Sequence, residues 1–548
     1  MGKKRVKCRS KSCVRARKRH QSRVDAHKSS TCSSPSTIIY SSKEQSLFEK
    51  YFYKQQWLPS QEHSSFFRTL KQTLPITFRI RDQQTLQEWE SEFLSYPHIS
   101  RIATKLPLPS NSCPSWQVLP FALEDFHFRY WLSSKTKTGH ISRQEFVSMI
   151  PVFLLDIKSH HRVLDLCSSP GSKTIQALDS LYQHHEEGRD SSNNSSNSNT
   201  NNSPPSGYVI ANEIDPPRAY ILAHRCRRTL SHRLQSLAIT CHNACKFPDV
   251  LAPLNRYDQR SKRSFQEQQQ LSENNTLLLF DRIICDVPCS GDGTLRKDTK
   301  VWKTWHPTYG ITLHSLQIRI AKRGIALLKI GGLMTYSTCS FHPIENEAVV
   351  TALLRTGCVE VASEKEIQSL MSGIKYRQGL TTWKVLGDEC EELFLENHTK
   401  KKNEKNSSNE YYPLSLWPPS PDMEMYDYIK SSLTRCIRMV PNDNNTGGFF
   451  IALLRKIKNF PNKLDYSTKI KSNSKVIMVT PKAVHHNLYP VVDDISPTEP
   501  STVFTRSPVG NGKHFKVSSE LAKYMSSCPG SKKLNIVCSG HYLRGTYS

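Results

Sequence analysis

Two cysteines that follow short apolar strands are the residues of this sequence whose setting best suits chemistry. Cys289 comes just after a buried run that ends near Asp286, and Pro288, which cannot continue a central sheet ladder, stops the strand between them. Cys339 follows a Gly-Gly turn and a second short apolar strand, and it stands among small hydroxyl residues. An open α/β sheet binds its ligand beyond the carboxyl ends of its strands. The pattern therefore predicts that both sulfurs face one pocket, with Asp286 at the same site.

The composition points to a nucleic-acid partner. The chain has 548 residues and a formal net charge of +27, a balance that favours a polyanion, with nucleic acid ahead of a membrane surface. Its 16 cysteines are scattered and follow no secretory leader, so we expect an intracellular chain with reduced thiols. The close cysteine pairs lack the second pair or nearby histidines of a zinc site, and there is no run of about 18 apolar residues to span a membrane. We therefore expect neither a metal nor a membrane.

The loop after the first strand has the features of a carboxylate-binding turn. A strand over 161–166 leads into the loop 167–173, which opens a helix. Backbone donors at such a helix start can receive a carboxylate, and Gly171 permits a close approach. The spaced glycines of a dinucleotide fingerprint are missing, which argues against a nicotinamide enzyme. The second strand ends at Glu213, and an acidic residue at that place typically accepts hydrogen bonds from a ribose diol.

A capping box precedes the first strand. Ser142 and Glu145 have the spacing at which each side chain bonds the other's backbone N–H, so we expect a helix to start there. Apolar residues at helical spacing follow, which indicates that this helix packs against the sheet and serves as a scaffold for the site.

Two groups of cations are candidate RNA contacts. Arg79 lies in the alternating strand at 76–80 and Arg81 directly follows it; both could face a phosphate backbone, with ordinary surface arginines as the alternative. A second group mixes cations with aromatic rings, which suits phosphate contact and base stacking, although aromatic packing at a domain seam fits it equally. Its members are Arg296, Lys297, Lys300, Trp302, Trp305 and His306.

Taken together, these motifs resemble those of the Sun-type RNA cytosine-5 methyltransferases, and most closely their eukaryotic tRNA branch. The resemblance covers roughly 46–457 and rests on the Pro-Cys loop, the Thr-Cys-Ser loop, the Ser-Arg-Gln-Glu segment at 142–145 and the loop 167–173. It implies S-adenosylmethionine as the cofactor. The cofactor-binding residues it implies are Cys167, Ser168, Ser169, Pro170, Gly171, Ser172, Lys173, Glu213, Asn243 and Asp286.

The sequence departs from the family's pattern inside this cofactor site. Ser168 and Ser169 stand where alanines are more usual, a small polar change that we expect binding to survive. Asn243 stands where the family generally has an Asp facing the adenine amine. An amide oxygen can still accept that bond, so we expect affinity to fall without vanishing.

The resemblance also implies a covalent mechanism. Carbon 5 of cytosine is a poor nucleophile until a thiolate adds to carbon 6, and the family places that nucleophile on the Thr-Cys-Ser loop, hence at Cys339. Asp286 would meet the base edge, and Cys289 would release the enzyme from the RNA. DNA cytosine-5 enzymes use the Pro-Cys thiol as the nucleophile, so reversed roles are the rival assignment. Ionising a free thiol with a pKa of about 8.5 needs help, for which Lys173 is a candidate.

The expected domain organisation follows from the same resemblance. We expect a disordered basic tail at 1–40, whose cation runs are typical of nuclear addresses, with a merely solubilising tail as the alternative. A small α+β RNA-binding region follows at 41–130, and a doubly wound, Rossmann-like methyltransferase domain at 131–457. The basic region 458–548 resembles part of a β-rich RNA-binding domain. Polar insertions that we expect to be disordered lie at 186–206, 252–276 and 397–410.

The sequence therefore predicts a monomeric, S-adenosylmethionine-dependent RNA methyltransferase that forms 5-methylcytosine, with tRNA as the substrate and the nucleus or nucleolus as its location. Ribosomal RNA is the alternative substrate. An RNA-binding scaffold with weak or no turnover is the alternative from another class, for which Asn243, the serines of the cofactor loop and the short C-terminal region speak.

Overall fold

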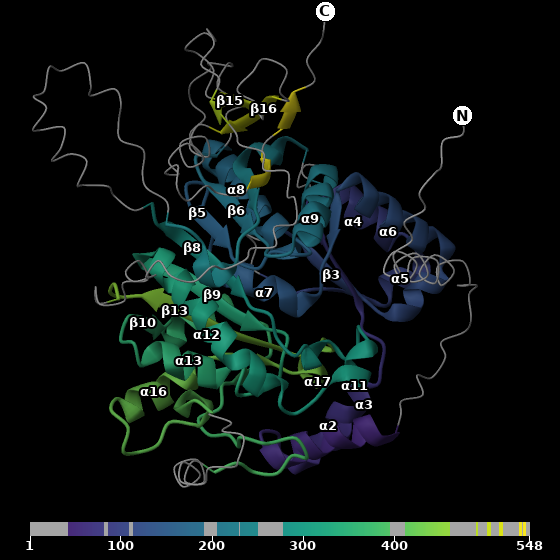
Figure 1. The fold of residues 1–548 in the computed structure, drawn as a ribbon. Coiled ribbons are helices and arrows are strands. Elements are labelled where there is room, and N and C mark those ends of the chain that lie inside the picture. Colours follow the sequence, from purple (N-terminus) through teal and green to yellow (C-terminus); the bar gives the residue numbers. More distant parts are fainter. Residues whose placement is uncertain are drawn as a thin grey trace, which may run out of the picture. The chain divides into compact units, whose positions relative to one another are not determined.

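The computed structural model describes seven stretches of the chain and five short strands beyond them (Figure 1). The expected tail at 1–40 and the expected insertions at 252–276 and 397–410 lie outside the described residues. None of the helices in the described stretches has the length and apolar character that a bilayer crossing needs. The stretches are 42–81, 86–108, 113–190, 205–229, 231–249, 278–394 and 412–460.

A ten-stranded sheet forms the centre of the structure. Strands β5 to β9 run parallel, and β13 joins β9 antiparallel. From β5 the chain builds outward through β6 and β7, then returns to place β8 on the other side of β5, which is the switch point where doubly wound sheets bind ligands. The order is β11 (Arg377–Gln378), β12 (Ile437–Met439), β13 (Phe449–Lys456), β9 (Leu328–Thr338), β8 (Phe280–Asp286), β5 (Arg162–Asp165), β6 (Tyr208–Asn212), β7 (Leu237–Thr240) and β17 (Ile536–Ser539), with β10 (Val359–Val361) on β13.

Helices bury the central parallel strands: every residue of β6 and β7 is buried, and both strands are mostly apolar for that reason. In the helix after β5, Ile175, Leu178 and Leu181 recur at a helical interval and join the sheet's core. In the helix before β9, Gly324 allows a close approach, because a Cβ there would lie 2.8 Å from Met334 Sδ. These helices are α7 (Phe146–Leu154), α8 (Ser172–Asp190), α9 (Pro216–Thr229), α12 (Tyr309–Leu327) and α13 (Glu347–Leu354).

A smaller antiparallel sheet precedes the central one. Its order is β2 (Ala103–Lys105), β3 (Ser115–Val118), β1 (Ile76–Ile80) and β4 (Ile141–Arg143), and a separate aromatic core holds it against α4 (Leu86–Leu94) and α6 (Phe126–Thr138). The predicted strand at 76–80 is confirmed by β1. We refer to these elements, residues 76–143, as the N-terminal module.

The predicted capping box is wrong. Ser142 lies in β4 opposite Arg79 of β1, and the helix begins only at Phe146, with Glu145 as an N-cap whose side chain makes no capping bond. The Glu145 carboxylate instead accepts a hydrogen bond from the Gly447 backbone N–H at 2.8 Å, and burial raises its pKa. Strand pairing with β1 outweighs the local helix signal.

The remaining elements connect these layers or lie beyond them. Helix α8 runs through 186–190, so the disorder expected for the insertion at 186–206 is wrong for these residues, and 191–204 lie outside the described residues. A further four-stranded antiparallel sheet has the order β14 (Tyr489–Pro490), β15 (Ser501–Thr505), β16 (His514–Ser518) and β18 (His541–Leu543). The other helices are α2 (Ser42–Gln55), α3 (Ser60–Leu70), α5 (Pro97–Ser100), α11 (Lys300–Thr304), α14 (Glu364–Leu370), α16 (Tyr426–Leu433) and α17 (Pro441–Asn444).

Candidate active site

The two cysteines singled out in the sequence lie together. Cys289 Sγ is 3.3 Å from Cys339 Sγ, and both side chains are partly buried. Their strands bring them there: β8 and β9 are parallel neighbours with Asp286 opposite Ser337, so the two chain segments leave the sheet at the same edge. The prediction that both sulfurs share one site is confirmed.

The contact between the sulfurs affects the protonation of Cys289. The pKa of Cys289 is well above its ordinary value, because its hydrogen bond to Cys339 and its burial both favour the protonated thiol. Either sulfur can be the donor in this contact. Cys289 is therefore held in its thiol form beside the second sulfur.

Asp286 lies at the end of β8 and holds two donors. Its Oδ2 accepts a hydrogen bond from Lys173 Nζ at 2.7 Å, and its Oδ1 accepts one from Ser337 Oγ at 2.8 Å. Lys173 also donates to Ser148 Oγ of α7 at 3.0 Å. Sequence reasoning offered Lys173 as a partner for the Cys339 thiolate; the structure pairs its ammonium with Asp286 instead.

The loop 167–173 joins β5 to α8 and turns sharply at Gly171, whose φ is +97°. A Cβ at this position would lie 2.4 Å from Leu222 Cδ1 of α9, so only glycine fits without a shift. The two serines that replace the usual alanines have partners: Ser168 Oγ donates to the Asn212 carbonyl at 2.7 Å, and Ser169 Oγ to the Arg218 carbonyl at 3.2 Å. They tie the loop to β6 and α9.

Asp165, at the end of β5, is a site residue that sequence reasoning missed. Its Oδ2 accepts a hydrogen bond from Thr174 Oγ1 at 2.7 Å, while its buried Oδ1 has no hydrogen-bond partner among the described residues. Burial raises the pKa of this carboxyl to about 7, although the bond from Thr174 opposes the shift. Its position in the sequence could have identified it, because an acid at the end of the first strand lies at the switch point of the sheet.

The residues expected at the nucleoside end lie at the ends of the next two strands. Glu213 is buried after β6; its Oε1 accepts a hydrogen bond from the Asp215 N–H at 3.1 Å, and its Oε2 lies 3.4 Å from Arg218 Nη2. Asn243 is exposed, and its Oδ1 accepts a bond from the Cys245 N–H at 2.9 Å. One lone pair of that amide oxygen is therefore already used.

These residues fit S-adenosylmethionine. Asp165 provides a buried acceptor without a partner, the turn at Gly171 brings backbone close, and Glu213 provides a carboxylate one strand away. An ammonium, a carboxylate and a ribose diol are the polar groups such a set can bind.

Glu345 is a second residue that the sequence did not reveal. It is fully buried between β9 and α13, and its carboxylate accepts hydrogen bonds from Ser290 N–H, Ser290 Oγ, Ser340 Oγ and Gln317 Nε2 at 2.5 to 2.9 Å. Ser290 and Ser340 are the residues that follow the two cysteines. One acid therefore joins the two cysteine loops.

Comparison with known proteins decides the family. Residues 203–455 match the family model described as 16S rRNA methyltransferase RsmB/F. This part of the chain belongs to the RsmB/F family. The Sun-type family predicted from the sequence is thereby confirmed, and the strand order of the central sheet confirms the predicted doubly wound fold.

Relatives of the RsmB/F domain extend the similarity. The chain is 34% identical over 450 residues to the multisite-specific tRNA:(cytosine-C(5))-methyltransferase trm4b of Schizosaccharomyces pombe, covering 77% of this chain and 60% of that protein. It is 32% identical over 439 residues to the multisite-specific tRNA:(cytosine-C(5))-methyltransferase of Saccharomyces cerevisiae, covering 76% of this chain and 56% of that protein. The chain thus spans a little over half the length of these relatives. A solved methyltransferase homologue from Pyrococcus horikoshii is 21% identical, with a TM-score of 0.43, covering 77% of this chain and 100% of that one.

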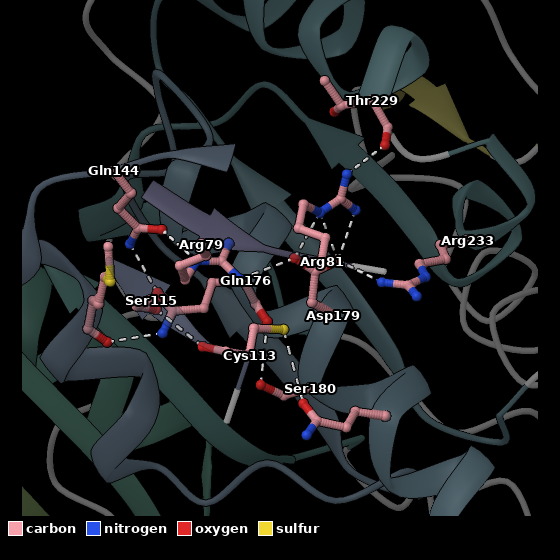
Figure 2. Close-up of polar contacts among 12 residues, drawn as sticks. Arg79, Arg81, Cys113, Ser115, Gln144, Gln176, Asp179, Ser180, Thr229 and Arg233 are labelled. Carbon is pink, nitrogen blue, oxygen red and sulfur yellow. Dashed lines mark hydrogen bonds and ion pairs between the residues drawn. The ribbon is translucent and has the colours of Figure 1, made fainter. Parts of the chain in front are cut away.

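The prediction that Arg79 and Arg81 face a phosphate backbone is wrong. Both guanidiniums are buried and point at Asp179 of α8, with N–O distances of 3.1 Å and 2.7 Å, and Arg233 adds a third at 2.7 Å (Figure 2). Burial alone would raise the pKa of Asp179, but Arg81 and the other guanidiniums hold it far below its usual range. These arginines join the N-terminal module to the RsmB/F fold.

The two tryptophans of the cationic and aromatic group that follows Cys289 pack between segments of the chain and do not face solvent. Trp302 and Trp305 are buried, with ring centroids 5.3 Å and 4.9 Å from Phe48 of α2. Arg296 is buried and donates to the carbonyls of Gln72, Thr73 and Thr446, and burial lowers its pKa to about 10. Phosphate contact and base stacking are therefore wrong for Arg296, Trp302 and Trp305, whereas Lys297 and Lys300 are exposed and stay candidate contacts.

Proposed function

We propose that this protein is an S-adenosylmethionine-dependent methyltransferase that forms 5-methylcytosine in tRNA. The observation that carries the proposal is the 3.3 Å contact between Cys289 and Cys339 at the mouth of the switch point. A covalent route to carbon 5 of a pyrimidine needs one thiolate to enter and a second group to help the product leave, and the two strand ends supply both. The printed names of the yeast relatives support tRNA as the substrate.

The residues have distinct tasks in this proposal. Cys339 Sγ adds to carbon 6 of the target cytosine, and Asp286, fixed by Lys173 and Ser337, meets the base edge. Bound S-adenosylmethionine would supply the methyl group that the activated carbon 5 takes up. Release then requires a base to take the carbon 5 proton, and we assign this to Cys289, which must first lose its own proton. The electron pair of that C–H bond re-forms the double bond between carbons 5 and 6 as the sulfur–carbon 6 bond breaks and Cys339 leaves as a thiolate. The target base must be unpaired or flipped out of its stack to enter.

One experiment tests the role of each thiol. Cys339→Ala should abolish both methyl transfer and any stable protein–RNA adduct, whereas Cys289→Ala should let the adduct accumulate on a denaturing gel. Cys245→Ala is the matched control, because that partly buried cysteine lies outside the pair and should behave as wild type. Adduct accumulation in Cys339→Ala but not in Cys289→Ala would reverse the roles.

The alternative substrate is ribosomal RNA, which the description of the matching family model favours. Bisulfite sequencing of total RNA from cells with and without the protein separates the two. Protein-dependent 5-methylcytosine confined to tRNA supports the proposal, and sites confined to ribosomal RNA would replace it. Bound labelled cofactor without transfer to either pool would favour the scaffold alternative.

The basic run at 1–40 supports a nuclear location for this activity, since clusters such as Lys3, Lys4, Arg5 and Lys7 are typical of nuclear addresses. A fluorescent fusion with and without residues 1–40 tests it. Nuclear signal that persists after the deletion would assign the address to another segment.

A further inference from the structure

Helix α9 (Pro216–Thr229) has one buried face and one unusual outer face. Ala219, Leu222, Ala223 and Cys226 are buried against the sheet. The outer side instead exposes 61% of Tyr220 and 62% of Ile221, two large apolar side chains on a polar surface.

The charge of this helix has a single sign. Its sequence PPRAYILAHRCRRT contains four arginines and a histidine but no carboxylate. Arg218, Arg227 and Arg228 are exposed, and Arg227 lies about two turns from Tyr220 on the same side of the helix. An ordinary solvent-facing helix mixes both signs in pairs one turn apart, so an all-cationic face with an exposed aromatic ring is complementary to a polyanion that carries flat bases.

The outer face of α9 is fixed beside the cofactor loop. Arg218 Nη2 donates to the Ser169 carbonyl at 3.3 Å, and Arg225 Nη1 donates to the Pro170 carbonyl at 3.1 Å. Leu222 fills the space above Gly171. The far end of α9 meets α6, where a Cβ on Gly139 would lie 2.9 Å from the Thr229 carbonyl oxygen, and exposed Lys137 continues the cationic run there. The helix thus carries positive charge away from the same edge of the sheet at which the thiols lie.

We propose that the outer face of α9, formed by Tyr220, Ile221, Arg227 and Arg228, is a docking surface for RNA that flanks the target nucleotide. This inference rests on the proposed RNA methyltransferase function. The arginines bind backbone phosphates and release their counterions, while Tyr220 stacks on an unpaired base. RNA is favoured over an acidic protein because the cationic face also exposes an aromatic ring, the side chain on which bases stack.

The test uses the full-length chain and fluorescently labelled tRNA. Binding anisotropy is measured across about 50 to 200 mM salt, where the slope of log affinity against log salt reports the number of phosphate contacts at about 0.7 to 0.9 each. The double variant Arg227→Ala/Arg228→Ala should flatten this slope by about 1.4 to 1.8. Tyr220→Ala should weaken binding about tenfold and leave the slope unchanged.

Two controls make the result specific. The double variant Arg355→Ala/Lys365→Ala removes two exposed cations from another part of the surface and should retain the wild-type slope. Cofactor affinity, measured by calorimetry with S-adenosylmethionine, should stay at the wild-type value in the α9 variants, because the variants spare Arg218 and Arg225, which contact the loop.

The outcomes separate this inference from the function on which it rests. If the α9 variants bind and methylate tRNA as the wild type does, the docking surface is wrong while the methyltransferase function stands. If the Arg355/Lys365 variant loses as much tRNA affinity as the Arg227/Arg228 variant, the effect comes from net charge alone, and the proposal is overturned as well. Unchanged tRNA binding with lost binding to polyglutamate would assign the face to an acidic protein. A wild-type chain that neither binds nor methylates RNA would remove both proposals together.

Discussion

Cys289 Sγ lies 3.3 Å from Cys339 Sγ, and the residue after each cysteine donates a hydrogen bond to the same carboxylate, that of Glu345. The distance between the sulfurs therefore depends on the Glu345 carboxylate as well as on the pairing of β8 with β9. A buried acid from the segment that follows β9 holds both loops in register, and the chemistry of the pair depends on a residue that touches neither sulfur. Four predictions follow from this and the neighbouring contacts.

Oxidation should join the two sulfurs. A disulfide needs about 2.05 Å between sulfur atoms, so only a small movement separates the thiols from a bond. Hydrogen peroxide would take two hydrogens and two electrons from the pair and become two waters, which should stop methyl transfer. Dithiothreitol should restore it, and peptide mass spectrometry should find Cys289 linked to Cys339. The Cys245→Ala control should respond as the wild type does; inactivation that resists the reductant would contradict the prediction.

Replacing Glu345 by Gln should impair positioning more than binding. The amide presents its own N–H groups to the Ser290, Ser340 and Gln317 donors, so buried donors lose their acceptor at a cost of about 1 to 3 kcal/mol. We expect kcat to fall about tenfold to a hundredfold while the KM for RNA stays near the wild-type value. Glu364→Gln, at an exposed position on α14, is the matched control. A change confined to KM would show that Glu345 acts on RNA binding instead.

The buried carboxyl of Asp165 should make stability depend on pH. Burial raises its pKa to about 7 in the folded chain, against an ordinary value of 3.8, so the folded state binds the proton more tightly. Its contribution to stability is fully present below the unfolded pKa and is lost as pH rises through 7. Asp165→Asn, which keeps an acceptor for Thr174, should therefore gain about 2 to 3 kcal/mol relative to wild type between pH 5 and pH 8. Urea midpoints of both proteins at each pH check this; an equal difference at the two pH values would contradict it.

Removing the charge of Asp179 should destabilise the whole structure. Asp179→Asn leaves Arg79, Arg81 and Arg233 buried around a neutral amide, at a cost of about 3 to 5 kcal/mol. Because the pKa of Asp179 is lowered by these partners, the stabilisation is present above the unfolded pKa and disappears only as pH falls below it. Glu366→Gln breaks a partly exposed pair with Arg455 and should cost at most about 1 kcal/mol. Urea midpoints at neutral pH compare the two, and equal losses would refute the cluster's importance.

The local sequence pattern was enough to predict the parts of the site that lie at the ends of strands. An apolar run, a proline and a turn cluster place Cys289, and a Gly-Gly turn and a strand place Cys339; the doubly wound topology then brings them together. Neither step needs knowledge of distant residues. Ser168 and Ser169, expected only to be tolerated, turned out to anchor the cofactor loop through carbonyls of β6 and α9.

The failures have a common physical cause. Arg79, Arg81 and Arg296 are cations that sequence alone would place in water. Each is buried instead because it has at least one partner 98 residues or more away along the chain. Ser142 lost its capping role to pairing with β1 for the same reason. Glu345 and Asp165 were overlooked because a lone acid beside a strand gives no sign of how many donors surround it.

The position of Asp179 on α8 gives the N-terminal module an influence on the cofactor loop. Lys173 and Asp179 lie less than two turns apart on one helix, a span of about 9 Å at 1.5 Å per residue. Arg79 and Arg81 of the module bind Asp179 on this helix. Lys173, the partner of Asp286, lies at the start of the same helix. A substitution that loosens the cluster of arginines around Asp179 is therefore expected to disturb the cofactor loop as well as the module.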